Sequence, residues 1–205
     1  MPGKTIAYHF TLLSPWAYLG HDAFLEIAAR HGCAIDFRPV ALGTVFAQTG
    51  GVPLAQRHPA RQAYRMIELQ RWRDRRGLAL QLRPAFFPCD IALADRAVLA
   101  LAAAGRAPGA YVRAALAAVW AQDRNCADPA VLAALLRECG EDEALLQIAA
   151  SEATKARYAR LTEEAIAMGV VGSPCYVLDG EPFWGQDRLD LLEDALESGR
   201  AGYRA

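Results

Sequence analysis

The sequence lacks a Cys-x-x-Cys pair, the spacing that thiol–disulfide enzymes and many zinc sites use. Its five cysteines are odd in number and lie far apart: Cys33, Cys89, Cys126, Cys139 and Cys175. A disulfide framework or a zinc site favours paired or closely spaced cysteines. We therefore expect reduced thiols, as in a reducing compartment, and no metal site.

The chain also lacks an excess of charge of one sign and a long apolar run. The formal net charge of −1 argues against a binder of nucleic acid. No stretch approaches the roughly 20 apolar residues of a membrane-spanning helix. The N-terminal residues lead into a strand pattern without the features of a signal peptide. We therefore expect a cytoplasmic protein whose partners include neither a membrane nor a nucleic acid.

What the chain does have is a strand-to-helix junction near its start. Residues 5–12 alternate between apolar and polar, as a strand requires, and a helical pattern follows through Ala28. Ser14 and Pro15 at the junction are typical of the N-cap and first turn of a helix. Backbone N–H groups and the helix dipole favour an anion such as a thiolate there. An N-cap without chemistry is the commoner case for such a stretch taken alone.

The order of patterns predicts the fold class. A second strand over 34–39 completes a parallel βαβ unit. Amphipathic helices then dominate, and whether the last two are one helix is left open: 60–75, 93–104, 110–121, 129–139, 143–151 and 154–168. Strand pattern returns over 170–178, and Asp179-Gly180 predicts a hairpin turn before a short strand and a last helix.

This order is the thioredoxin topology with added helices. We predict an α/β, thioredoxin-like fold with a large all-helical insertion after the second strand. The thioredoxin-like domain is expected to comprise residues 1–44 and 152–205, and the insertion residues 45–151. In such a fold, Ser173-Pro174 opens the third strand, and a cis-proline there faces the N-terminus of the first helix. An ordinary trans proline at a strand boundary is the alternative.

Four segments together resemble the 2-hydroxychromene-2-carboxylate isomerase family: Phe10 to Gly20, Leu69 to Trp72, Gly169 to Val177 and Phe183 to Leu189. Kappa-class glutathione transferases are close relatives, and both belong to the DsbA-like branch of the thioredoxin fold. The segments occur in matching order over nearly the whole chain. The resemblance implies a glutathione-dependent isomerase of aromatic compound catabolism that acts on a small conjugated substrate as a homodimer.

The resemblance also implies roles for individual residues. Ser14 stands where thioredoxins carry their nucleophilic cysteine, and it is expected to hydrogen-bond the glutathione sulfur. Ser173, before Pro174, is expected to pair its backbone with the cysteinyl part of glutathione. The γ-glutamyl end is expected to lie against the segment Trp184, Gly185, Gln186 and Asp187. Asp187 could equally cap the last helix.

The chain departs from the family around the expected acceptor pocket. The segment 51–58 lacks the asparagine that family members use, and the loop holding Phe86 and Phe87 is unusually apolar. We expect the pocket to be lined by Trp16, Phe86, Phe87, Arg57 and Arg61. Glutathione binding is thus better supported than the chromene substrate, and another conjugated or aromatic compound is an open alternative.

Three other functions compete with the isomerase. A kappa-like glutathione transferase would use the same residues. A DsbA-like thiol–disulfide oxidoreductase would need Cys175 or Cys89, because Ser14 to Ala17 contains no cysteine. A non-catalytic interaction module would bind no glutathione. Among the histidines, His9 is expected to be a satisfied core residue, and His21 and His58 are expected at the surface.

Overall fold

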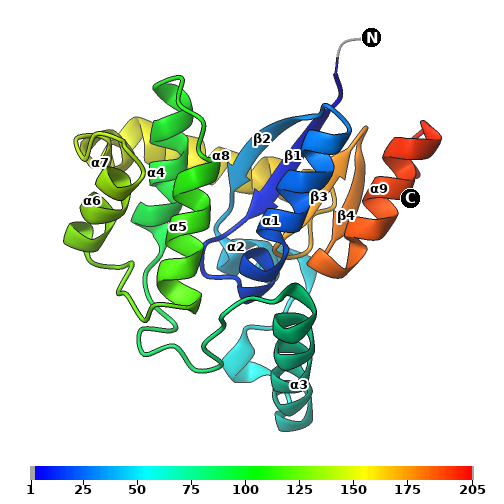
Figure 1. Cartoon of the computed structure of the whole chain (residues 1–205), viewed down its shortest axis with the longest axis horizontal. Coiled ribbons are helices and arrows are strands. Elements are labelled where there is room, and N and C mark those ends of the chain that lie inside the picture. The colour runs from blue at the N-terminus through cyan, green and yellow to red at the C-terminus, as the bar shows by residue number, and fades with distance from the viewer. Residues whose placement is uncertain (1–2, 205) are drawn as a thin grey trace.

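The computed structural model describes residues 3–204 and has a four-stranded mixed sheet at its centre (Figure 1). The strand order is β2 (Ala34–Pro39), β1 (Thr5–Phe10), β3 (Cys175–Leu178), β4 (Glu181–Trp184). Strands β1 and β2 pair in parallel, whereas β3 pairs antiparallel with both β1 and β4. The predicted βαβ unit and the hairpin turn at Asp179-Gly180 are both confirmed.

Helices account for most of the remaining chain. The α-helices are α1 (Pro15–Arg30), α2 (Leu42–Thr49), α3 (Pro59–Arg76), α4 (Ala92–Ala103), α5 (Gly109–Trp120), α6 (Pro129–Glu138), α7 (Leu145–Ala150), α8 (Glu152–Ala167) and α9 (Leu189–Ser198). Two short 3₁₀ turns are η1 (Leu54–Gln56) and η2 (Gln186–Arg188). Within residues 3–204 no helix is long and apolar enough to cross a bilayer.

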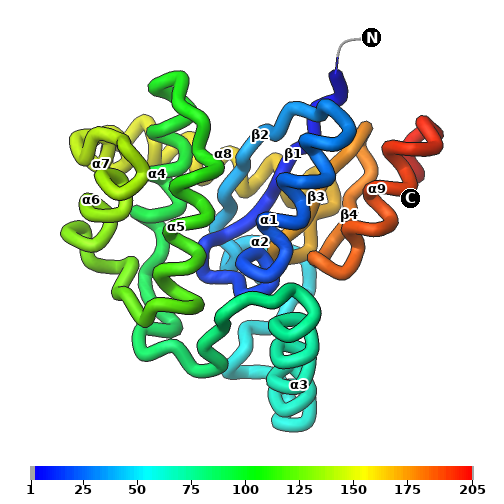
Figure 2. The backbone as a smooth tube through the Cα atoms, viewed as in Figure 1, coloured from blue at the N-terminus to red at the C-terminus, as the bar shows by residue number. Residues whose placement is uncertain are grey.

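Helices cover both faces of the sheet (Figures 1 and 2). On the α1 face, Ile6, Tyr8 and Phe10 of β1 belong to a core that continues into α4, α5 and α6. On the other face, Cys175 and Val177 pack with residues of α2 and α8. The alternation of β1 therefore buries both of its faces, as expected for a central strand.

The predicted helical insertion lies between β2 and β3, and the fold class is confirmed. Its helices share one buried core with the sheet, since Leu116 and Leu135 belong to the same cluster as Ile6. Helix α3 stands apart from the other helices, below the sheet in Figures 1 and 2. The division of the chain at residues 45 and 151 stays a prediction of the sequence.

Several local predictions need correction. Helix α2 was not predicted. The structure answers the open question about the last two helical stretches, since α7 and α8 are separate and the Ser151 side chain caps α8 through the Thr154 N–H. The first strand ends at Phe10 rather than Leu12, because the backbone N–H groups of Thr11 and Leu12 donate to side chains. The third strand is shorter than expected and begins at Cys175.

The histidine predictions were partly wrong. His9 is buried, but neither ring nitrogen has a hydrogen-bond partner among the described residues. His21 was expected at the surface, yet it is buried in α1, with Nε2 3.3 Å from the Gly109 carbonyl oxygen. His58 is exposed, as expected, and its Nδ1 accepts from the N–H of Ala60 at the start of α3. Helix α1 packs against α5, which explains the burial of His21.

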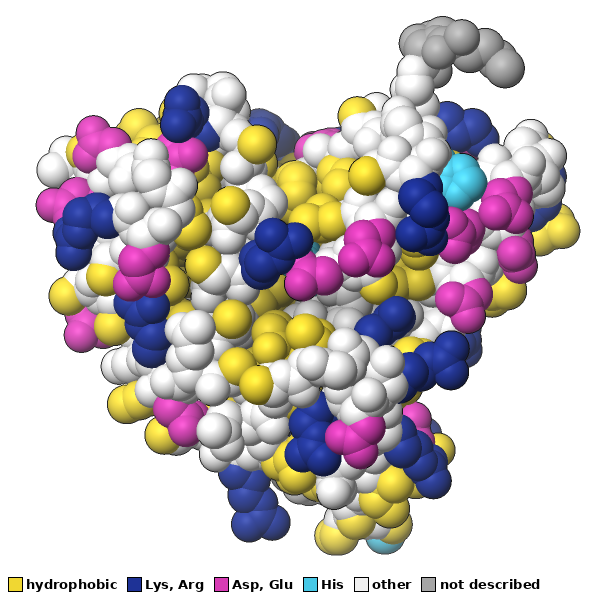
Figure 3. All heavy atoms as spheres, viewed as in Figure 1, with side chains coloured by type: hydrophobic (Ala, Val, Ile, Leu, Met, Phe, Trp, Pro, Cys, Tyr) yellow, Lys and Arg dark blue, Asp and Glu magenta, His cyan; other side chains and the backbone are white. Residues whose placement is uncertain are grey.

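The surface agrees with the nearly balanced charge. On the face shown in Figure 3, basic and acidic side chains are interspersed, and no large patch has a single sign.

Candidate functional site

The candidate site begins at the N-terminus of α1. Ser14 has an extended backbone conformation, and its Oγ accepts a hydrogen bond from the Ala17 N–H at 3.2 Å. The predicted N-cap is therefore confirmed. The Ser14 hydroxyl also donates to the carbonyl oxygen of Ser173 at 3.0 Å. Only 3% of Ser14 is exposed, so its hydroxyl is almost completely buried next to the Ser173 backbone.

The loop that carries Ser173 is held from two sides. The Ser173–Pro174 peptide bond is cis, as expected at this position of a thioredoxin-like fold, and not trans. The Ser173 Oγ accepts from the Thr11 N–H at 3.0 Å, and the Pro174 carbonyl accepts from the Gly185 N–H at 2.9 Å. The end of β1, the start of β3 and the end of β4 thus meet at the N-terminus of α1.

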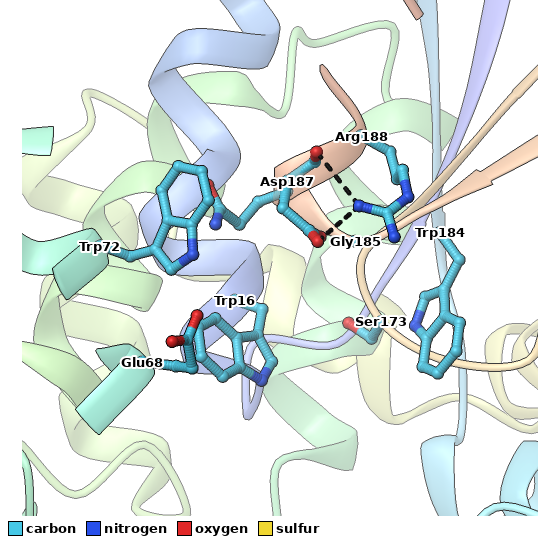
Figure 4. Close-up of a pocket in the computed structure, with 9 residues that line it drawn as sticks. Trp16, Glu68, Trp72, Ser173, Trp184, Gly185, Asp187 and Arg188 are labelled. Atoms are coloured by element: carbon cyan, nitrogen blue, oxygen red, sulfur yellow. Dashed lines mark hydrogen bonds and ion pairs between the residues drawn. The ribbon is translucent and has the colours of Figure 1, made fainter. Parts of the chain in front are cut away.

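A cavity of about 270 Å³ opens beside Ser173 (Figure 4). Its lining residues come from α1, α3, the cis-proline loop and the segment after β4: Trp16, Glu68, Trp72, Ser173, Trp184, Gly185, Gln186, Asp187 and Arg188. Figure 4 shows Glu68 and Trp72 projecting from α3 toward Trp16, with Ser173 and Trp184 on the opposite side. We call this space the first cavity.

Gln186 is fixed tightly at the edge of the first cavity. It is buried, and a Cβ atom placed on Gly20 of α1 would lie only 2.5 Å from its Cβ. The glycine therefore allows η2 to approach α1. From α3, Arg76 donates to the Gln186 side-chain oxygen at 3.1 Å. Glycine and arginine together place the Gln186 backbone at the cavity.

Asp187 faces the first cavity but does not cap the last helix. Its carboxylate forms an ion pair with Arg188 at 2.7 Å, and α9 has no side-chain cap. The alternative reading of Asp187 as an N-cap was therefore wrong. Because both partners are about half exposed, this ion pair is weak and can exchange Arg188 for another cation.

A second cavity of about 630 Å³ adjoins the first. The two share Trp16, Glu68 and Trp184 as common walls. The rest of the second cavity is lined by Phe46, Gly50, Gly51, Val52, Arg57, Ala60, Arg61, Tyr64, Arg65 and Val171. The side chains thus combine aromatic surface with three guanidinium groups, which suits a planar anionic molecule.

The three arginines of the second cavity are unpaired. Within the described chain, none of Arg57, Arg61 and Arg65 forms an ion pair, whereas Arg57 donates to the Val52 carbonyl. Burial, with a smaller contribution from Arg57, lowers the pKa of Arg65 to about 10. A partly desolvated cation without a carboxylate partner is a receptor for an anion.

Some predicted site residues lie elsewhere. Ser14 and Pro174 are not among the lining residues of either cavity, and the Ser14 hydroxyl is hydrogen-bonded to Ser173, which does line the first cavity. Phe86 and Phe87 also line neither cavity. The Phe87 ring packs against Trp120 at a centroid distance of 4.9 Å, and Phe86 is exposed on its loop. The apolar ring of Phe87 thus packs against the helical core rather than lining these cavities, and Phe86 contributes to neither.

Comparison with known proteins places the chain in a family. Residues 5–197 match the DSBA-like thioredoxin domain family. A 2-hydroxychromene-2-carboxylate isomerase of Sphingobium xenophagum is 31% identical over 196 residues, which cover 94% of this chain and 98% of that protein. The chain belongs to the 2-hydroxychromene-2-carboxylate isomerase family. It is therefore an enzyme of the isomerase type, within the DsbA-like branch of the thioredoxin fold.

Further relatives agree with this assignment. A 2-hydroxychromene-2-carboxylate isomerase of Pseudomonas sp. strain C18 is 31% identical and covers 93% of this chain and 89% of that protein. A solved structure of a 2-hydroxychromene-2-carboxylate isomerase superposes with a TM-score of 0.83 at 27% identity, covering 95% of each chain. The relatives match the insertion as well as the sheet, so the family shares the whole architecture.

In this member of the isomerase family, the cysteines are not poised as nucleophiles. All five are free in the described structure. Burial raises the pKa of the Cys175 thiol to about 12, and burial also raises that of Cys89. Because the thiolate is the reactive form, neither cysteine restores dithiol exchange at this site.

Of the α3 side of the site, only Arg61 was predicted from the sequence. Arg65, Glu68 and Trp72 line the cavities, yet none was predicted as a site residue. The signal was the spacing, because Arg61, Arg65, Glu68 and Trp72 follow steps of four, three and four along one helical face. Helix α3 therefore presents one polar and aromatic face to both cavities, while its opposite side contributes little to the core.

Proposed function

We propose that this enzyme is a glutathione-dependent isomerase of a conjugated aromatic carboxylate, with Ser14 stabilising the glutathione thiolate. The observation that carries the proposal is the pair of adjoining cavities above the N-terminus of α1. The first cavity holds two carboxylates, each in an ion pair with an arginine, beside Ser173, whereas the second is aromatic and holds three guanidinium groups that have no ion-pair partner among the described residues. One space suits a peptide-like thiol, and the other suits a planar carboxylate.

The residues of the first cavity fit glutathione. Asp187 and Glu68 offer carboxylates to the ammonium of the γ-glutamyl end. Ser173 precedes the cis-proline and offers its backbone to an extended peptide-like ligand. Gln186 is held rigidly by Gly20 and Arg76, which preorganises the edge of the cavity. Trp72 and Trp16 add apolar walls that exclude water.

Ser14 has the position that thiolate stabilisation requires. Its hydroxyl proton is donated to the Ser173 carbonyl and becomes available by rotation of one side-chain bond. The Oγ accepts from the Ala17 N–H, which holds the side chain in place while its proton turns from the Ser173 carbonyl to an anion. The positive end of the α1 dipole acts in the same direction. When bound, glutathione supplies a thiolate nucleophile that adds to the conjugated system of the substrate and is later released.

The second cavity is proposed to hold the substrate. Arg65 is the best candidate to bind the carboxylate because it is partly desolvated and has no acidic partner in the described residues. Arg57 and Arg61 line the same space and add positive charge. Trp16 and Trp184 stand at the boundary of both cavities and offer flat surfaces to conjugated rings. 2-Hydroxychromene-2-carboxylate, the substrate named for the relatives, has these features.

A homodimer in the cytoplasm is part of the proposal. Three large apolar side chains are exposed on or near α3: Val52, Tyr64 and Ile67. Helix α3 projects from the body of the molecule in Figure 1, and Ile67, unlike Val52 and Tyr64, lies outside the second cavity, so the second copy is proposed to pack on the Ile67 side of α3. Five free cysteines suit a reducing compartment that also holds reduced glutathione. Light scattering at micromolar concentration measures the molar mass in solution, and the mass of a single chain would contradict the proposed dimer.

Calorimetric titration tests the cofactor. Reduced glutathione and S-methyl glutathione, which cannot form a thiolate, are titrated into the wild type and into Ser14→Ala. We expect saturable binding of glutathione to the wild type that weakens on S-methylation, and a much smaller difference between the two ligands in Ser14→Ala. If the wild type does not bind glutathione at millimolar concentration, the proposed cofactor and the proposed mechanism are both wrong.

Product analysis separates isomerase from transferase. The two activities use the same residues, but an isomerase releases glutathione unchanged whereas a transferase consumes it. Mass spectrometry of the products after many turnovers is expected to show a substrate isomer and the initial amount of glutathione. A product carrying the mass of glutathione would instead establish the kappa-like transferase.

A further inference from the structure

A buried carboxylate lies next to the loop that carries Ser14. Asp95, in the first turn of α4, has no exposed surface. Its Oδ1 accepts from the Leu12 N–H at 2.9 Å, and its Oδ2 accepts from the Thr11 hydroxyl at 2.8 Å. The Tyr158 hydroxyl of α8 donates to the same Oδ2 at 2.9 Å. A buried carboxyl group costs free energy even when three donors hydrogen-bond to it, so its presence here needs an explanation.

The contacts continue from Asp95 to both serines of the candidate site. Thr11 uses its hydroxyl for Asp95 and its backbone N–H for the Ser173 Oγ, at 3.0 Å. The Ser173 carbonyl in turn accepts from the Ser14 hydroxyl. Helices α4 and α8 are thereby connected to the N-terminus of α1 and to the cis-proline loop by a series of hydrogen bonds.

Ordinary strand pairing does not hold this loop. Strand β1 ends at Phe10, and the next two backbone N–H groups donate to the side chains of Ser173 and Asp95 instead. Without Asp95, the Leu12 N–H would be buried without a partner, and the Thr11 and Tyr158 hydroxyls would lose their acceptor. The loop would then shift to find other partners, and Ser14 and Ser173 would shift with it.

We propose that Asp95 is a positioning residue that holds Thr11 and Leu12 so that Ser14 and Ser173 face the bound thiol in the correct geometry. The inference rests on the proposed glutathione site, since it assigns a remote residue to that site. Asp95 acts through Thr11 and does not line either cavity. A misplacement of about 1 Å can reduce catalysis about a hundredfold, so the effect is measurable.

Three variants and one control test the proposal. Asp95→Ala removes all three acceptor contacts. Asp95→Asn keeps the shape, retains an acceptor for the Leu12 N–H and can donate to the two hydroxyl oxygens. Tyr158→Phe removes a single donor to Asp95. The control Tyr111→Phe removes a buried hydrogen bond to Ala94 of the same helix α4 without touching the loop. Urea unfolding gives the stability of each variant.

Two readouts distinguish positioning from simple stability. The first is the calorimetric dissociation constant of glutathione, and the second is the pKa of the bound thiol, followed by the ultraviolet absorbance of the thiolate. For folded Asp95→Ala we expect binding weakened about tenfold and a higher thiol pKa. Asp95→Asn is expected to recover most of both effects, and Tyr111→Phe to leave both unchanged at reduced stability.

The outcomes separate this inference from the proposed function. If the wild type binds glutathione and folded Asp95→Ala matches it in affinity and thiol pKa, Asp95 has no positioning role. If Asp95→Ala does not fold, Tyr158→Phe decides, because its unchanged binding and thiol pKa would overturn the inference and a shift in both would support it. Absence of glutathione binding to the wild type would overturn the proposed function first and this inference with it.

Discussion

The hydroxyl of Ser14 donates a 3.0 Å hydrogen bond to the carbonyl oxygen of Ser173. This contact joins the N-terminus of α1 to the cis-proline loop, which are the two elements expected to hold a thiol. It also keeps the serine proton occupied until an anion competes for it. In the proposed complex, the thiolate would compete with the Ser173 carbonyl for this proton.

We predict that Ser14→Ala lowers kcat/KM by about a hundredfold, because a preorganised donor to developing charge is lost. The substitution also removes the N-cap of α1 and so costs about 1 kcal/mol of unfolding free energy. Steady-state kinetics and urea unfolding measure the two effects. The matched control is Ser151→Ala, which removes the N-cap of α8 away from both cavities. Equal loss of activity in both variants would contradict a specific role for Ser14.

We predict that Arg65→Gln raises KM for the carboxylate substrate by about tenfold or more, because a charge-assisted hydrogen bond contributes about 1.5 to 3 kcal/mol. The affinity for glutathione should change little, since Arg65 lines only the second cavity. Arg73→Gln is the control, because Arg73 lies on the same helix, pairs with Asp74 and lines neither cavity. An unchanged KM in Arg65→Gln would place the carboxylate elsewhere.

We predict that Gly20→Ala disrupts the first cavity. The new methyl group would collide with Gln186 and displace η2, at a cost of about 1 to 3 kcal/mol in stability. Glutathione should then bind more weakly, as calorimetry would show. Gly43→Ala in α2 serves as the control, since its methyl group would meet no atom within 4 Å. Wild-type affinity in Gly20→Ala would show that the position of Gln186 is unimportant.

Stability should fall as the pH is lowered from about 6.5 to about 4. Burial lowers the pKa of His9 and of His21 to about 4, from 6.5. Between these pH values both histidines bind a proton in the unfolded chain but stay neutral in the folded chain. Burial raises the pKa of Asp95 to about 7, from 3.8, so the folded chain binds one proton that the unfolded chain does not. The net excess of one proton in the unfolded state makes acid destabilising.

The same linkage gives a sharper test with Asp95→Asn. Removal of the opposing carboxyl group should steepen the loss of stability by up to about 1.4 kcal/mol per pH unit between pH 4 and 6.5. Urea unfolding at several pH values for both proteins measures this slope. Parallel curves for the wild type and the variant would mean that Asp95 is ionised throughout the window in the folded protein.

The local signals of the sequence identified one side of the site. Ser14 and Pro15 predict the start of a helix because serine is a preferred N-cap and proline is tolerated in the first turn, and Asp179-Gly180 predicts a hairpin turn. The cis bond before Pro174 followed from the expected fold. These features depend on a few neighbouring residues or on the order of elements, which a single sequence displays.

The other side of the site depends on contacts between distant segments. Asp95 accepts a hydrogen bond from Thr11, which lies 84 residues away in the sequence, and no residue near Asp95 in the chain indicates this contact. Phe87 is apolar, but only the structure shows that its partner is Trp120. His21 is buried because α5 covers it. Apolar or polar character predicts burial on average, whereas the partner of each side chain is decided by packing.

The most direct test of the account is the isomerisation of 2-hydroxychromene-2-carboxylate by the purified enzyme, followed spectrophotometrically with and without reduced glutathione. We predict turnover that requires glutathione, stops when S-methyl glutathione replaces it, and leaves the amount of glutathione unchanged. Turnover at the same rate without glutathione would contradict the central claim that the nucleophile is a thiolate held by Ser14.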